Sequence, residues 1–227
     1  MPINTFLNKT KRYSRHTYGD DGLRGKRNIL SLSFVASDLQ RAALAAPAAL
    51  MAAGPLATSG VTTQTPVPNP DVPRNITLTL GGTTASIGAG NAVVTGTNAE
   101  GAVITENIVV TAATGGLLTG NKAFKTVTSV VYPATTGAGA TASIGYGSKL
   151  GIGMRNIASM PIKVLVRSAA GVETLEDPSA SVFSATVMEN NTVTTATAQD
   201  GARSFRVYVL NYKWAVDPIN SNPDYGL

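Results

Sequence analysis

The sequence predicts a mainly β protein, an antiparallel sandwich or barrel that carries an extended N-terminal arm. Beyond residue 74, short runs of β-branched and aromatic residues alternate in polarity with the period of two that is typical of strands. These runs recur at intervals of about ten residues and are separated by Gly-, Asn- and Pro-containing turns, the spacing of a sandwich or barrel. The basic residues, by contrast, gather at the N-terminus.

The charge divides the chain into a basic arm and a neutral body. Up to Arg41 there are eight basic and three acidic residues, a difference that equals the whole net charge of +5, and the remainder has ten residues of each sign. The 227 residues allow one or two domains. The chain has no Cys, which excludes disulfides, thiolate nucleophiles and Cys-ligated zinc and fits assembly in a reducing cytoplasm. Its single His16 lies in a polar basic segment and is expected to be solvated.

Residues 1–73 are expected to form an extended basic arm, a short Ala-rich helix and a Pro-rich linker. Residues 1–33 show no periodicity, so they should order on a partner at an entropic cost; a solvated tail is the alternative. An acidic protein surface suits the arm better than nucleic acid, because the basic residues are diluted and only Tyr13 and Tyr18 are there to stack on bases. The expected partner-binding residues are Ile3, Phe6, Leu7, Lys9, Lys11, Arg12, Arg15, Arg24, Lys26 and Arg27.

The Ala-rich stretch 37–53 is interpreted as a helix capped by Ser37 or Asp38 and ended or kinked at Pro47, or as an apolar loop against a neighbour. A cleaved signal peptide is disfavoured because Asp38 and Arg41 interrupt the approach to the apolar run. The run is too short to span a bilayer, so no membrane contact is expected. Five prolines make 54–73 an extended linker.

The body is predicted to span residues 74–212, with two subdomains, 74–153 and 154–212, before an extended tail over 213–227. Its first half should contain strands at 74–80, 83–90 and 140–146. It should also contain a meander of at least three strands, made by 91–97, 103–111 and 122–132, with the first two joined at Glu100-Gly101.

The second half should contain a strand, MPIKVLVR, within 156–167, strands at 181–188 and 192–198, a polar turn at 173–178 and a hairpin at Asp200-Gly201. The closing strand, 205–212, carries large apolar residues on both faces, which predicts that one face meets another subunit. The expected subunit-interface residues are Phe205, Val207, Tyr208, Val209, Leu210 and Tyr212.

No arrangement of residues predicts catalysis, so the chain is not expected to be an enzyme or to bind a cofactor or metal. The glycine-rich run 145–153 has Ser148-Lys149 in the reverse of the phosphate-loop order, which favours a turn or close packing over a nucleotide site. Glu100 with Glu106, and the acids of 173–177, are the candidate carboxylate pairs for glycoside hydrolysis, but acids in turns are usually solvated, so neither pair predicts an active site.

Three segments resemble a β-rich family of tailed-phage and prophage virion proteins. They read TGTNAEGAVITENI at 95–108, GNKAFKTVTSV at 120–130 and ASIGYGSKLGI at 142–152, and a weaker likeness continues over 188–212. The resemblance covers roughly residues 70–212. It implies a capsid decoration (cement) protein that binds the major capsid protein and itself, as a homo-oligomer with a trimer favoured, in a virion assembled in the bacterial cytoplasm.

Two other readings remain open from the sequence. A tail, baseplate or head–tail adaptor protein would have the same composition and motifs. A receptor- or carbohydrate-binding module would need exposed aromatic residues on loops, where only Tyr132, Tyr146 and Trp214 are available.

Overall fold

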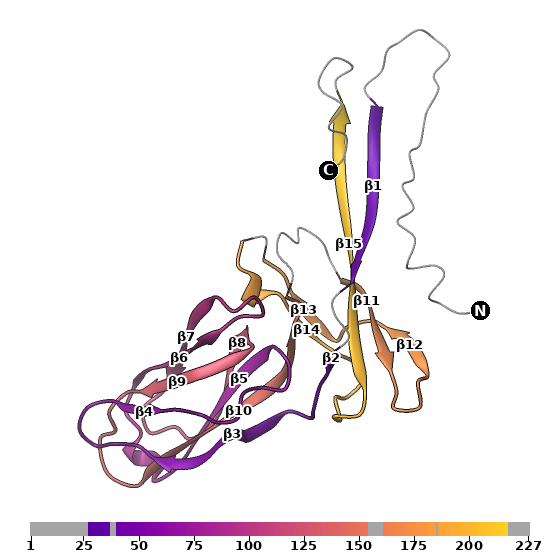
Figure 1. Ribbon diagram of the computed structural model, residues 1–227. Helices are drawn as coiled ribbons and strands as arrows, with labels where there is room; N and C mark the ends of the chain where they lie inside the picture. The colour runs from indigo at the N-terminus through magenta and orange to yellow at the C-terminus, as the bar shows by residue number, and fades with distance from the viewer. Residues whose placement is uncertain (1–26, 37–39, 154–160, 185, 218–227) are drawn as a thin grey trace, which may run out of the picture.

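The fold is mainly β, and every strand pairing among the described residues is antiparallel (Figure 1). The computed structural model describes residues 27–36, 40–153, 161–184 and 186–217, with backbone alone for the strand residues before 41 and at 161–162 and 209–217. The predicted fold class is confirmed over these ranges. Most of the expected arm, residues 1–26, lies outside them.

The strands form three sheets. Sheet 1 contains β1 (Arg27–Ala36), β2 (Gln40–Arg41), β11 (Pro161–Arg167), β12 (Glu173–Glu176) and β15 (Ser204–Asp217). Sheet 2 contains β3 (Ala46–Pro55), β5 (Arg74–Gly82), β8 (Gly116–Phe124), β10 (Ala140–Gly151), β13 (Ala180–Val182) and β14 (Thr192–Thr194). Sheet 3 contains β4 (Thr62–Gln64), β6 (Gly90–Thr97), β7 (Val103–Val110) and β9 (Thr126–Tyr132), and the two 3-10 turns are η1 (Thr84–Ser86) and η2 (Met188–Asn190).

Sheets 2 and 3 pack around one large apolar core, and we call strands β3 to β10 with their loops, residues 46–153, the lobe. The alternation of β7 decides which side chains enter the core: Ile104, Ile108 and Val110 are buried, whereas Val103 and Val109 are exposed. Phe124, Tyr132 and Ile144 are fully buried in the same core. The two-faced strand that the sequence predicts at 103–111 is therefore confirmed.

A second apolar cluster joins sheet 1 to the end of sheet 2. Val164 and Val166 of β11 and Phe205 and Val207 of β15 pack there against Leu150, which lies near the end of β10. Since β10 lines both clusters, it connects the two halves of the body. The second cluster includes Leu150 and Ile152 from before the boundary expected at 153–154 and Val164 from after it, so that boundary does not separate the two clusters.

The predicted meander is wrong in its order. β6 lies between β7 and β9 in sheet 3, whereas β8, which lies between β7 and β9 in the sequence, belongs to sheet 2 and pairs with β5. The run 122–132, expected as one strand, is split at Lys125, whose backbone N–H donates to Thr97 O at 2.8 Å where the chain passes from one sheet to the other. Alternation over 122–132 shows extended chain but does not show that its two halves join different sheets.

The Ala-rich helix is also wrong. Residues 46–55 form β3, which pairs with β10 through a bulged register and buries Leu50 in the lobe core. Alanine has the highest helix propensity, but propensity is worth less than about 1 kcal/mol per residue, so strand pairing and burial outweigh it here, and Pro47 further disfavours a helix. Because β1, β3 and β4 precede residue 74 and pair into the sheets, the boundary at residue 73 does not separate arm from body.

Smaller expectations are corrected as well. Residues 84–86 form η1 where a strand over 83–90 was expected, and the polar turn at 173–178 contains β12, paired with β11. Asp200-Gly201 lies at a turn as predicted, but the strands on either side, β14 and β15, belong to different sheets and form no hairpin. The strand expected at 205–212 continues to Asp217, so the extended tail does not begin at residue 213.

The glycines of 145–153 serve close packing, one of the two expected roles. A Cβ on Gly145 would lie 2.0 Å from Ala46 O, and one on Gly147 would lie 2.5 Å from the Asn75 amide nitrogen. The bulge of β3 can approach β10 this closely only because position 145 has no side chain.

Candidate assembly surface

The residues predicted to bind a partner lie largely outside the described ranges. This holds for Ile3, Phe6, Leu7, Lys9, Lys11, Arg12, Arg15, Arg24 and Lys26, and also for His16. Arg27 is the first residue of β1, opposite Asp217 of β15. The docking role of the arm therefore stays a prediction.

Two of the residues predicted at a subunit interface belong to the chain's own core. Phe205 and Val207 are buried in the second apolar cluster with Val164 and Val166. Alternation places Arg206, Tyr208, Leu210 and Tyr212 on the opposite face of β15. The face of Phe205 and Val207 is thus used within the chain, and Tyr208 on the opposite face is also buried.

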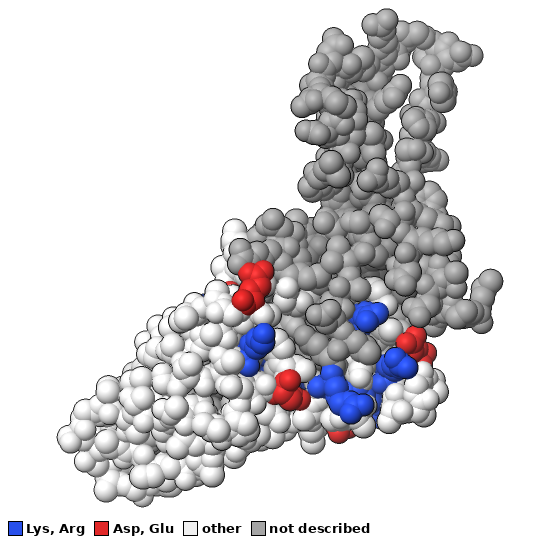
Figure 2. All heavy atoms as spheres, in the orientation of Figure 1, with Lys and Arg blue, Asp and Glu red and all other residues white. Residues whose placement is uncertain are grey.

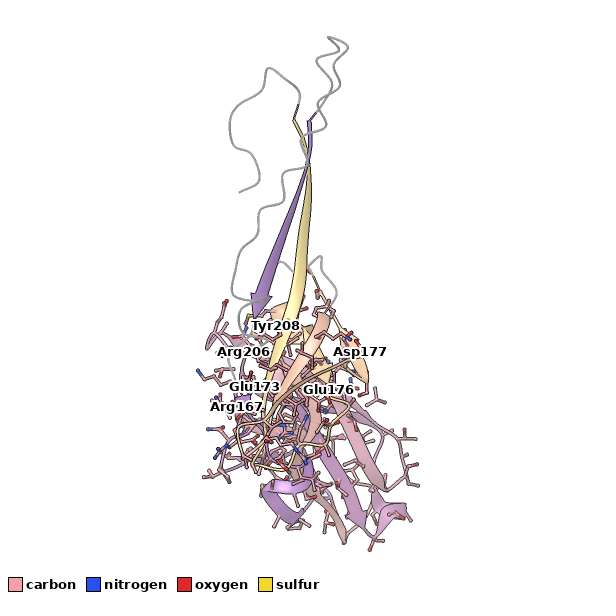
Figure 3. All side chains as sticks on the ribbon, turned by 90° about the vertical axis from the view of Figure 1, so that its right-hand side faces the viewer. Arg167, Glu173, Glu176, Asp177, Arg206 and Tyr208 are labelled. Atoms are coloured by element: carbon pink, nitrogen blue, oxygen red, sulfur yellow. The ribbon has the colours of Figure 1, made fainter. Side chains whose placement is uncertain are left out.

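Strands β1 and β15 continue beyond sheet 1 as a two-stranded ribbon. The pairing of β15 with β11 ends at Val209, opposite Pro161, whereas its pairing with β1 continues to Asp217, opposite Arg27. Arg27–Phe34 and Leu210–Asp217 are therefore paired only with each other among the described residues. Figures 1 and 3, which differ by a quarter turn, both show this ribbon projecting from the rest of the molecule. We call it the ribbon.

The register gives the two faces of the ribbon opposite characters. Residues directly opposite each other in an antiparallel pair share a face, and successive residues alternate between faces. One face, the apolar ribbon face, is assigned Leu30 opposite Trp214, Leu32 opposite Tyr212, and Phe34 opposite Leu210. The other face is assigned Arg27 opposite Asp217, Ile29 opposite Ala215, Ser31 opposite Lys213, and Ser33 opposite Asn211.

By alternation, the apolar ribbon face continues at its base into the face of sheet 1 that carries Arg206 and Tyr208, both of which are labelled in Figure 3. Tyr208 shares this face with Leu165 of β11, and the two are only 6% and 4% exposed. Charged residues lie around them: Arg167 opposite Glu173, and Lys163, whose Nζ is 2.7 Å from the Asp177 carboxylate. The apolar strip is thus bordered by charge at its base.

The surface of the lobe is nearly free of charge. Figure 2 shows a face on which Lys, Arg, Asp and Glu gather near sheet 1, while the far end of the lobe carries none. The sequence agrees, since 42–70, 75–99, 107–121 and 126–148 contain no charged residue. Backbone hydrogen bonds hold the loops at this end together, from Thr135 to Ala57 O at 3.0 Å, from Thr136 to Ser86 O at 2.8 Å, and from Ala113 to Ile87 O at 2.9 Å. We call this surface the uncharged loop end.

Arg74 holds the two halves of the body together. Its guanidinium is fully buried, donates to Ala43 O at 3.0 Å and to Asp71 Oδ1 at 2.9 Å, and also donates to Gln199 Oε1. Gln199 Nε2 in turn donates to Ser148 O at 2.7 Å, and the Tyr146 ring lies 4.5 Å from the guanidinium carbon. Burial lowers the pKa of Arg74, which Asp71 partly offsets. Sequence reasoning missed this residue; the Asp71–Arg74 pair in a segment almost free of charge was its signal.

Glu106 connects the edges of sheets 2 and 3. Its carboxylate is buried and accepts the backbone N–H groups of Asn121 at 2.6 Å and Lys122 at 3.3 Å, both in β8. Burial raises the pKa of Glu106, opposed by those two N–H groups and by the charges of Lys122 and Lys149. Gly120 makes room, because a Cβ there would lie 2.6 Å from Glu106 Oε2.

Three of the acids that are candidates for hydrolysis, Glu106, Glu176 and Asp177, have partners within the fold. Glu100 is exposed at the β6–β7 turn, while Glu106 is bound to β8. Among the acids of 173–177, Glu176 accepts the Thr197 N–H at 3.0 Å, and Asp177 forms an ion pair with Lys163.

The described part of the chain contains no group of three or more His, Cys, Asp or Glu that could hold a metal ion. Within that same part, none of the helices is both long and apolar enough to cross a bilayer.

Comparisons of the chain with protein-family models, with curated proteins and with solved structures found no match.

Proposed function

We propose that the protein is a structural subunit of a tailed-phage particle, a decoration protein that binds the assembled head and stabilises it. Residues 95–108, 120–130 and 142–152 resemble virion proteins of tailed phages, which suggests the kind of particle. These segments lie between the start of β6 and the residue after β10. A ligand that binds only the assembled lattice stabilises it by mass action, against heat and internal pressure.

The uncharged loop end is the surface of the described chain that best supports a role in binding another protein. The centres of protein–protein interfaces are depleted in charged residues, and their backbone usually moves little on binding. The loops at this end contain no charged residue, and hydrogen bonds between their backbones restrict their movement, so they have both properties. The basic residues of 1–26 would add electrostatic attraction to an acidic capsid surface, which governs the attachment rate more than the final affinity.

The test is the copy number of the protein in purified particles, measured by quantitative mass spectrometry. A number comparable with that of the major capsid protein, together with binding to tailless heads, supports the decoration role. A few copies per particle would instead place the protein in the tail, baseplate or head–tail adaptor, the second candidate. Absence from particles would refute both.

The arm is tested by deleting residues 1–26, which spares every described strand. Deleting 1–53 would also remove β1 and most of β3, including buried Leu50, so it cannot report on the arm alone. The shorter deletion should keep the fold and lose attachment to heads. Replacing Lys9, Lys11, Arg12 and Arg15 by Ala should slow attachment and flatten its salt dependence, whereas Lys125→Ala on the body should change neither. Full occupancy by the deleted protein would show that the arm is not the anchor.

A further inference from the structure

The ribbon pairs two chain segments that lie nearly two hundred residues apart in the sequence, Arg27–Phe34 and Leu210–Asp217. The described part of the chain adds no third strand to either. A two-stranded ribbon is at best marginally stable in water and needs a further strand or a covered apolar face. The ribbon is therefore the element of this fold that most needs an external contact.

The apolar ribbon face identifies where that contact would form. Three consecutive cross-strand pairs bring Leu30, Leu32 and Phe34 onto one face with Leu210, Tyr212 and Trp214. Antiparallel sheets commonly cover one face and leave the other to water, which gives this division between apolar and polar faces. The polar residues of the ribbon all fall on the other face, apart from Asn28 at the end.

The charge of this face suits a second copy of the same chain. The chain carries a net charge of +5, so two copies repel each other at long range. The charged residues of the ribbon are Arg27, Lys213 and Asp217, and the register assigns all three to the opposite face. Two copies can therefore bring their apolar ribbon faces together without placing like charges in contact, and each face then meets the same residues that it contributes, as a symmetric interface requires.

The area is also adequate for a symmetric contact. Fully covered, Phe34, Tyr212 and Trp214 alone would bury about 150–250 Å² each. With the three leucines added, the contact approaches the roughly 800 Å² per partner of a standard interface. Aromatic residues are also those enriched at the centres of such contacts.

We infer that the apolar ribbon face is the self-association surface of this protein, and that it is covered by the same face of another copy. This assignment replaces Phe205 and Val207, which the chain's own core uses, with residues further along β15 and on β1. It does not depend on the identity of the particle.

The chain contains a single tryptophan, and it lies on this face, so its fluorescence reports the contact directly. The full chain is diluted through the micromolar range while sedimentation equilibrium and Trp214 emission are recorded. The emission should shift to longer wavelength on dilution, in step with dissociation. This measurement needs no substitution and is unaffected by variants that fail to fold.

A pair of double variants then locates the surface. L32T with Y212T removes one cross-strand pair from the apolar ribbon face and keeps residues that favour strands. S33T with N211T changes the adjacent pair, on the opposite face, as the matched control. The first variant should raise the dissociation constant by more than about tenfold, a change of 1.4 kcal/mol, while the second should leave it unchanged.

Three results would overturn the inference. One is a chain that stays monomeric at micromolar concentration, and another is equal association by both double variants. The third is Trp214 emission that stays constant while sedimentation shows the copies dissociating. A shift on deleting residues 1–26 would then show that the chain's own N-terminus covers the face, and a shift only on adding phage heads would show that a head protein does. The last of these outcomes would still leave the proposed function standing.

Discussion

The lobe and the ribbon differ in what covers their apolar residues. In the lobe, two sheets face each other, and Phe124, Tyr132 and Ile144 are fully buried by other residues of the same chain. In the ribbon, the same kind of alternation gathers Leu32, Phe34 and Trp214 on one face of a two-stranded ladder to which no further strand of the described chain is added. An alternating strand thus specifies which residues share a face, but not whether that face is covered within the chain or by another molecule.

The comparison implies that the two regions depend on different conditions. The lobe should be as stable in a dilute monomer as in an assembly, because its contacts are intramolecular. The order of the ribbon should depend on protein concentration, because local stability follows buried apolar contacts and protected backbone hydrogen bonds. Four substitutions test or refine this difference.

The largest effect is expected from Phe124→Ala in the lobe core. Removing a fully buried aromatic side chain leaves a cavity and should lower the free energy of unfolding by about 3–5 kcal/mol, measured by urea denaturation. Leu117→Ala, at a 54% exposed position of the same strand, should change it by less than about 0.5 kcal/mol. The ribbon variant L32T with Y212T should leave the unfolding of the lobe unchanged; equal destabilisation by this variant would refute the separation of the two regions.

The next effect is expected from Arg74→Met, at the junction between the halves of the body. It removes the donors to Ala43 O, Asp71 and Gln199, and leaving buried polar partners without their charge should cost about 3 kcal/mol. Hydrogen exchange should then show β11 and β15 opening more readily than β5 and β10.

Arg203→Met is the control for this junction, because its ion pair with Asp200, at 3.0 Å, has partners that are 38% and 40% exposed. It should cost less than about 1 kcal/mol, as surface pairs do. If both variants lose the same stability, the Arg74 network does not hold the halves together.

The sequence predicted the fold class and most strands, because alternation is a local property. It failed where partners outside the local segment decide the structure. Residues 46–55 looked helical because they are rich in alanine, yet pairing with β10 and burial of Leu50 make them a strand. Residues 122–132 alternate without interruption, yet the two halves pair with β5 and with β6. Neither outcome can be read from a single segment.

The candidate surface shows the same limit. The sequence indicated that 205–212 is apolar on both faces, but only the structure shows that Phe205 and Val207 pack against Val164 in the chain's own second cluster. The pairing of Leu30 with Trp214 joins opposite ends of the chain, and no local pattern reports it. Arg74 and Glu106 were missed as structural residues because burial and hydrogen-bond partners define their roles.

A smaller effect is expected from Gly120→Ala, which tests whether Glu106 joins the edges of sheets 2 and 3 within the lobe. The new Cβ would lie 2.6 Å from Glu106 Oε2 and 3.0 Å from Ile76 O, so it should displace the carboxylate and cost about 1–3 kcal/mol. At Gly81, in the neighbouring strand β5, the nearest atom is Thr141 Oγ1 at 3.6 Å, so Gly81→Ala should be neutral or stabilise by up to about 1 kcal/mol. Chemical denaturation of the two variants decides, and a similar loss in both would refute the role of Glu106 in joining the sheets.

The smallest effect concerns the charge of Glu106 and appears as a dependence on pH. Burial raises the pKa of this carboxyl above its ordinary value, so between the two values the folded state binds more protons than the unfolded state. The contribution of Glu106 to stability therefore falls as pH rises through that window, and at neutral pH the full cost of burying the charge remains, offset by the N–H groups of Asn121 and Lys122.

Glu106→Gln removes this titration, so the stability of the variant relative to the natural chain should increase with pH across the window. The exposed Asp200, whose pKa backbone N–H groups lower, gives the opposite slope but is present in both proteins and cancels in the difference. Denaturation at a series of pH values measures that difference, and a flat line would show that folding does not raise the pKa of Glu106.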